Sequence, residues 1–140
     1  FWKTVCSLTV GDNTNITGDC VVMDSNMHYV KNIETGKIAR PWGKIVIGEN
    51  CWINSGSIVV KGAILPNYTI TARNSFLCKD YRSHGSPLFL VGAPATPKNC
   101  KLQRIFDAEK EQDLSSFFLS NDVEEFSDEP GLFVDKTIKI

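Results

Sequence analysis

Residues 45–80 read IVIGENCWINSGSIVVKGAILPNYTITARNSFLCKD, and every sixth residue from Ile47 onward is aliphatic with one exception. These positions are Ile47, Ile53, Val59, Leu65, Thr71 and Leu77. The residue four places after each of the first five is small or modest in size. A half-buried strand would alternate every two residues and a helix about every 3.6, so neither accounts for a period of six.

The same count extends upstream through Val10, Ile16 and Val22 and then reaches His28. Apart from His28, nine such positions are filled and eight are aliphatic. In a hexapeptide β-helix, each unit of six forms a short strand and a corner, and three units close one coil of about eighteen residues. We therefore predict an all-β fold, a parallel β-helix over residues 1–100, with an antiparallel sandwich as the alternative.

The six-residue count breaks once and then ends. From His28 to Ile47 is nineteen residues, so we interpret residues 29–44 as a loop extruded from a coil, a kind of segment that often carries function. LVGAPATPK, residues 90–98, is typical of a terminating turn. We expect residues 101–140 to form a separate tail that caps the stack or contacts another subunit. This tail would contain an amphipathic helix or helix pair, followed by a β-rich terminal run.

Composition narrows the functional classes. The net charge of −1 does not favour a nucleic-acid or anionic-membrane partner. Five unclustered cysteines indicate neither a disulfide framework nor a metal site and suit a reducing cytoplasm. We find no apolar run of the roughly 20 residues that a membrane span needs and no signal peptide. The chain begins with Phe1, so we expect part of the natural protein to precede it.

Several motifs, in this order and spacing, are similar to those of hexapeptide-repeat acyltransferases. They are Asp-Ser-x-x-His at 24–28, a Thr-Gly loop at 35–36, Ile-Gly-x-x-x-Trp-Ile at 47–53, Lys-Asp at 79–80 and Gly-x-Pro-Ala at 92–95. The resemblance covers residues 8–98. It is closest to the sugar O-acetyltransferases of capsular and surface-polysaccharide pathways, and includes the maltose and galactoside acetyltransferases.

The resemblance implies a left-handed β-helix, a homotrimer, acetyl-CoA in the groove between adjacent prisms, and a sugar acceptor near His28. His28 matches the general base of the family. A sugar hydroxyl is almost wholly protonated at pH 7, and a histidine with an ordinary pKa of about 6.5 suits the removal of its proton during attack. The period alone favours a different interpretation, in which His28 is a buried ring at an inward position.

We expect further site residues around His28 and in the acetyl-CoA groove. Asp24 and Asn26 would orient the imidazole or bind acceptor hydroxyls, although Asp-Ser-Asn is also ordinary turn chemistry. Arg40 and Trp42 would close over the acceptor or anchor the loop. The positions that match the acetyl-CoA groove are Trp52 beside the pantetheine, Ser55 and Arg73 on its wall, and Cys78 and Lys79 near the phosphates. Trp52 has an alternative interpretation as an exposed aromatic on a trimer face. After Pro94-Ala95 the family often has Arg or Lys, whereas this chain has Thr96 and then Lys98, so a phosphate contact here would move to Lys98 or weaken. The family usually has a small residue at the position of Arg73.

Three other functions compete with O-acetyl transfer. N-acetylation of an amino-sugar would use the same base and donor groove. A non-catalytic β-helix scaffold, with the acidic tail as its interaction device, would not need His28, Trp52 and Lys79 together. A carbonic-anhydrase-type prism needs three zinc-binding histidines, and this chain has only His28 and His84.

Overall fold

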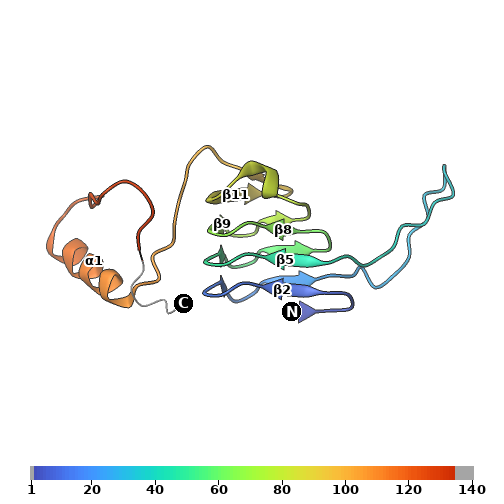
Figure 1. Ribbon diagram of the computed structural model, residues 1–140, viewed down its shortest axis with the longest axis horizontal. Coiled ribbons are helices and arrows are strands. Elements are labelled where there is room, and N and C mark those ends of the chain that lie inside the picture. The colour runs from blue at the N-terminus through green and yellow to red at the C-terminus, as the bar shows by residue number, and fades with distance from the viewer. Residues whose placement is uncertain (1, 135–140) are drawn as a thin grey trace. The chain divides into compact units, whose positions relative to one another are not determined.

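The computed structural model of the chain describes residues 2–134. The chain divides into two compact units, Phe1–Leu102 and Gln103–Ile140. In the first unit short strands stack in layers, as Figure 1 shows, and the chain visits three sheets in turn. The β5 sheet contains β2 (Leu8–Val10), β5 (Ile45–Ile47) and β8 (Ile64–Leu65). The β6 sheet contains β3 (Asn15–Ile16), β6 (Trp52–Ile53), β9 (Thr69–Thr71), β11 (Leu88–Gly92) and β12 (Ala95–Pro97). The β7 sheet contains β1 (Trp2–Lys3), β4 (Val21–Met23), β7 (Ile58–Val60) and β10 (Phe76–Leu77).

The strand register follows the six-residue count. Ile47 lies opposite Leu65, Ile53 opposite Thr71 and Val59 opposite Leu77, each pair eighteen residues apart. These pairings are parallel, so the predicted coil of three strands is confirmed and the antiparallel sandwich is wrong. Only β11 and β12 pair antiparallel among the named strands, at the end of the stack.

The repeated aliphatic positions form the core. Six of them are at most 1% exposed: Val22, Ile47, Ile53, Val59, Leu65 and Leu77. Four polar residues of the repeats, Ser57, Thr69, Thr71 and Ser75, are buried with hydrogen-bond partners, as most buried polar groups are. The Ser57 and Thr71 hydroxyls lie 3.1 Å apart, and the Ser75 hydroxyl donates to the Ala72 carbonyl.

The corners of the coil place particular residues in the left-handed backbone region. Asn13, Asn50 and Tyr68 stack at one corner with φ of 58°, 56° and 60°. Gly56, with φ of +75°, lies one coil below Asn74 at the next corner, and a Cβ on Gly56 would come within 2.0 Å of the Asn74 Oδ1. Asparagine and glycine tolerate this conformation better than other residues, which explains their recurrence at the corners.

One coil is interrupted by the predicted loop. Across the interruption, Val10 pairs with Ile47 and Val22 with Val59, so partners are thirty-seven residues apart instead of eighteen. The extra residues leave the stack as an arm with an outgoing and a returning segment, cyan in Figure 1. Isolated antiparallel bridges join the two segments, Ser25 with Trp42 and, further out, Lys31 with Ile38. We call the segment predicted as an extruded loop, residues 29–44, the arm.

The last turns close the stack. Residues 82–84 form the 3₁₀ turn η1 (Arg82–His84), and the β11–β12 hairpin contains the predicted terminating turn. Tyr81 is fully buried beside it, and its hydroxyl donates to the Ala95 carbonyl at 2.8 Å.

The second unit has one α-helix within residues 103–134, α1 (Ala108–Ser120). The Asp107 side chain caps it by accepting from the Lys110 N–H. This resolves the choice between one helix and two, because residues 101–107 are not helical. The predicted β-rich run begins at residue 132. Residues 132–134 contain no strand, and the remainder of that prediction lies outside the described residues.

Candidate functional site

His28 lies where the arm leaves the coil, six residues after Val22, the last buried position of the six-residue count before the arm. Its side chain is exposed, so the interpretation of His28 as a buried ring is wrong. The reason is a change of backbone direction: Met27 adopts a φ of 68°, and the chain turns out of the wall before it reaches the next inward position. The result is an imidazole that is open to solvent at the edge of a rigid stack.

Asp24 is the group that anchors this departure. Its carboxylate is 1% exposed and accepts three backbone hydrogen bonds, from Val5 to Oδ1 at 2.7 Å and from Cys6 and Ser7 to Oδ2 at 2.6 and 2.8 Å. The Asp24 carbonyl in turn accepts from the N–H of Gly43 at 2.9 Å. With both carboxylate oxygens occupied by backbone N–H groups and only 1% of the residue exposed, Asp24 holds the root of the arm and presents almost no surface to a sugar.

The other predicted acceptor residues come together at the base of the arm. The Asn26 N–H donates to the Pro41 carbonyl at 2.8 Å, which holds the outgoing and returning segments side by side. The Arg40 Nε donates to the Trp42 carbonyl at 3.2 Å, and the Lys61 Nζ from the next coil donates to the Arg40 carbonyl at 2.9 Å. Asn26 and Arg40 are exposed and Trp42 is half-buried. The outgoing and returning segments therefore present polar and aromatic groups at the base of the arm, where His28 also lies.

The predicted acetyl-CoA residues lie at several places on the coil. Ser55 and Arg73 share the corner between the β6 and β7 sheets, where the Asn74 N–H donates to the Ser55 carbonyl at 3.0 Å. Trp52 lies on the neighbouring β6 strand, and its indole N–H donates to the Thr17 hydroxyl at 3.1 Å.

Cys78, Lys79 and Lys98 occupy other positions. Cys78 and Lys79 follow β10 at the corner from which the arm also leaves, where the Lys79 carbonyl accepts from Ile64. Lys98 lies beyond β12, at the end of the stack. The arrangement brings Lys79 to the same corner as the arm, whereas Lys98 stands apart from both corners.

The β7 sheet lies between these two corners. Its outer face is a part of the candidate site that was not predicted from the sequence. Val22, Val59 and Leu77 point inward and are buried. The alternate residues on the same strands are apolar yet half-buried or exposed, namely Val21, Met23, Ile58, Val60 and Phe76. The sequence does carry a signal for this face, because apolar residues stand on both sides of each inward position of these strands. The face gives an apolar wall between Arg73 at one edge and Lys79 at the other.

The corner with the arm is electropositive. Asp80 accepts three side-chain contacts from Arg82, the shortest 2.7 Å from Nη2 to Oδ2. Those hydrogen bonds, the Arg82 N–H and the nearby Lys44 charge lower the pKa of Asp80 from 3.8 to about 2. Asp80 therefore stays ionised at neutral pH and pairs with Arg82, while Lys44 and Lys79 remain exposed cations at this corner.

In residues 2–134 no three His, Cys, Asp or Glu side chains gather in a way that could hold a metal ion. Among the same residues no helix is long and apolar enough to cross a membrane.

Comparison with solved structures gives two chains of similar fold. The chain is similar to the polysialic acid O-acetyltransferase OatWY, with a TM-score of 0.60 and 19% identity over 79% of this chain and 54% of that one. It is also similar to the polySia-specific acetyltransferase NeuO, with a TM-score of 0.53 and 19% identity over 81% of this chain and 60% of that one. The predicted resemblance is thus confirmed at the level of the fold.

The chain spans between half and two thirds of the length of these two structures. No protein-family profile matches the chain, and no curated protein matches it.

Proposed function

We propose that the protein is an acetyltransferase that moves an acetyl group from acetyl-CoA to a hydroxyl of a sugar, in surface-polysaccharide biosynthesis. The observation that carries the proposal is the exposed His28 at the base of the arm, on a coil similar in fold to two acetyltransferases of polysialic acid. The predicted acceptor residues lie at the base of the arm, as His28 does. The apolar wall is the outer face of the β7 sheet, whose strand β4 leads into the arm.

In this proposal His28 acts as general base. Its imidazole takes the proton of the acceptor hydroxyl as the oxygen attacks the carbonyl carbon, and returns it to the sulfur when the carbon–sulfur bond breaks. The products are an acetyl ester and the free thiol of CoA. Such proton transfer is worth roughly 10²–10⁴-fold in rate. Asn26, Arg40 and Trp42 would position the acceptor.

The residues present fit acetyl-CoA, which would supply the acetyl group as a thioester. The outer face of the β7 sheet offers apolar side chains of the kind that a pantetheine chain packs against, and it ends at exposed cations suited to phosphate, Arg73 and Lys79. Trp52, Ser55 and Cys78 stay predictions at the edges of this wall. Lys98 stays a prediction at the end of the stack.

We further propose that the coil winds left-handed, that three copies assemble as a homotrimer, and that the protein works in the cytoplasm, where its free cysteines stay reduced. Sedimentation at about three times the 15.6 kDa chain mass would support the trimer, and a monomer at all concentrations would contradict it.

The test is acetyl-CoA consumption with a panel of acceptors that includes nucleotide sugars, an amino-sugar and polysialic acid fragments. We expect His28→Ala to lower kcat/KM by roughly 10²–10⁴-fold. His84→Ala is the matched control, because His84 is also an exposed histidine but lies in η1. Full activity in His28→Ala would refute the general base.

The same panel separates the alternatives. Acetylation of the amino-sugar alone would indicate N-acetyl transfer. The absence of both turnover and calorimetric CoA binding would favour the scaffold.

A further inference from the structure

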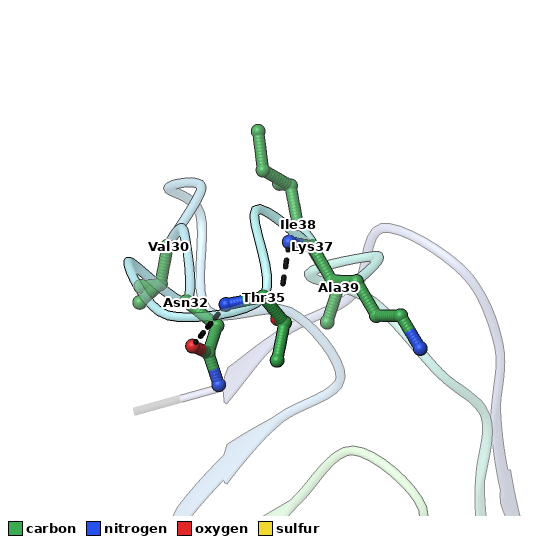
Figure 2. Close-up of a pocket in the computed structure, with 6 residues that line it drawn as sticks. All are labelled: Val30, Asn32, Thr35, Lys37, Ile38 and Ala39. Atoms are coloured by element: carbon green, nitrogen blue, oxygen red, sulfur yellow. Dashed lines mark hydrogen bonds between the residues drawn. The ribbon is translucent and has the colours of Figure 1, made fainter.

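The outer part of the arm carries apolar side chains that the rest of its own unit, residues 2–102, does not cover. Tyr29, Val30 and Ile33 are 68%, 73% and 91% exposed, and Ile38 on the returning segment is 57% exposed. Figure 2 shows a pocket between the outgoing and returning segments, lined by Val30, Asn32, Thr35, Lys37, Ile38 and Ala39. Exposed apolar side chains gathered on one segment mark a candidate contact surface.

The conformation of the arm tip is held locally. The Asn32 side-chain oxygen accepts from the N–H groups of Glu34 and Thr35, and the Thr35 hydroxyl accepts from Lys37. The arm therefore presents its apolar side chains on a shaped turn. Around them lie four cations and one carboxylate within residues 29–44, a net charge of +3: Lys31, Lys37, Arg40 and Lys44 against Glu34.

Helix α1 has the opposite charge, and part of its apolar surface is open as well. None of its thirteen residues is buried, although a helix of that length is only marginally stable in water without packing. Phe117 packs against Phe126, with ring centroids 5.0 Å apart. On the neighbouring face Leu114 and Phe118 line two adjoining hollows, and Leu119 beside them is 89% exposed. Within residues 103–134 this face therefore has room for a further apolar partner.

Carboxylates surround these hollows. Glu111 borders one, and Glu124 and Glu125 border the other. Residues 103–134 hold nine carboxylates against two cations, a net charge of −7. One of those cations, Lys110, is already paired with Asp128 at 3.3 Å. A partner for this surface must be apolar and cationic.

We propose that the arm of one copy docks on the α1 surface of a second copy. The arm has the apolar side chains and the positive charge that the α1 surface requires. The contact joins two different surfaces, so it is heterologous, and such contacts close into a ring when the rotation between copies allows it. The inference concerns assembly and does not depend on acetyl transfer.

The first experiment asks whether the contact lies between copies. Natural-isotope and ¹⁵N-labelled full-length protein are mixed at low concentration, reconcentrated, and treated with a carbodiimide that joins lysine directly to carboxylate. We expect peptides that link Lys31 or Lys37 to Glu124 or Glu125 with one partner labelled and the other not. Links found only within one isotope would mean an intramolecular contact and would overturn the proposal, as would their absence.

The second experiment reverses charge on each side and measures mass by sedimentation velocity, with folding checked by circular dichroism. We expect Lys31→Glu with Lys37→Glu, and separately Glu124→Lys with Glu125→Lys, to weaken self-association at least tenfold. Joining all four substitutions in one chain should restore it. Lys98→Glu with Lys101→Glu is the control of equal charge change.

Self-association unchanged by either reversal, or weakened equally by the control, would refute the arm contact. Either result would leave the proposed acetyl transfer standing, because that is measured by turnover.

Discussion

Replacing Asp24 with asparagine tests how the arm is rooted. Asp24 is 1% exposed, and its two oxygens accept from three backbone N–H groups at 2.6–2.8 Å. The amide of Asp24→Asn can turn only one oxygen toward them. In the better orientation it keeps the bonds from Cys6 and Ser7, and its NH₂ faces the N–H of Val5, so a donor meets a donor.

The magnitude follows from these three bonds. A hydrogen bond to a charged group contributes about 1.5–3 kcal/mol and a neutral one about 0.5–1.5. The substitution removes one charged bond and makes the other two neutral, while it also removes the cost of burying a charge. We expect a net loss of about 2–4 kcal/mol in the free energy of unfolding.

Urea unfolding, followed by tryptophan fluorescence, measures this loss. Asp12→Asn is the matched control, because Asp12 is an exposed aspartate on the same coil system and should change stability by no more than about 0.5 kcal/mol. If Asp24→Asn proves as stable as Asp12→Asn, the anchoring role is refuted. A stable Asp24→Asn that loses activity would instead return Asp24 to the acceptor site.

Three further outcomes are expected. Gly56→Ala should lower stability by more than about 1 kcal/mol in urea unfolding, because its φ is +75° and its Cβ would collide with the Asn74 side chain; an unchanged midpoint would contradict the corner geometry. Tyr81→Phe should cost about 1–2 kcal/mol by leaving a buried carbonyl without its 2.8 Å donor, and a thermal scan that matches the parent would count against this. In an NMR titration the Asp80 carboxyl should show a pKa near 2 that rises toward 3.8 in Arg82→Ala. Since folding lowers this pKa, the pair stabilises the fold above about pH 3.8 and the effect is lost as the pH falls through about 2; a titration near 3.8 in the parent would refute the pairing.

The coil could be predicted from the sequence because its cause is local and repeated. Ile47, Ile53 and Val59 each report the same environment, and one deviation such as Thr71 does not disturb the period. The arm was predictable for the same reason, since nineteen residues cannot fit a count of six. The helix boundaries in the tail were harder to predict, because α1 buries no residue and so leaves a weak periodic signal.

The site was predictable in its positions but not in its environment. The six-residue period by itself placed His28 at an inward position, and only the fold shows that the chain turns outward at Met27 before reaching it. Likewise DSN at 24–26 indicates a turn, but Asp24 is held by residues 5–7, seventeen to nineteen positions away in the sequence. The apolar outer face of the β7 sheet becomes one surface only when β4, β7 and β10 are stacked.

The sequence by itself therefore determined the stacked coil, its eighteen-residue repeat and the place of the arm, because each depends on a pattern within a few neighbouring residues. The tertiary structure alone decided that His28 is exposed and that Asp24 is buried as an anchor. It also decided which lysines come together at the corner from which the arm leaves. Those properties depend on contacts between coils that lie eighteen or thirty-seven residues apart, and no local pattern records them.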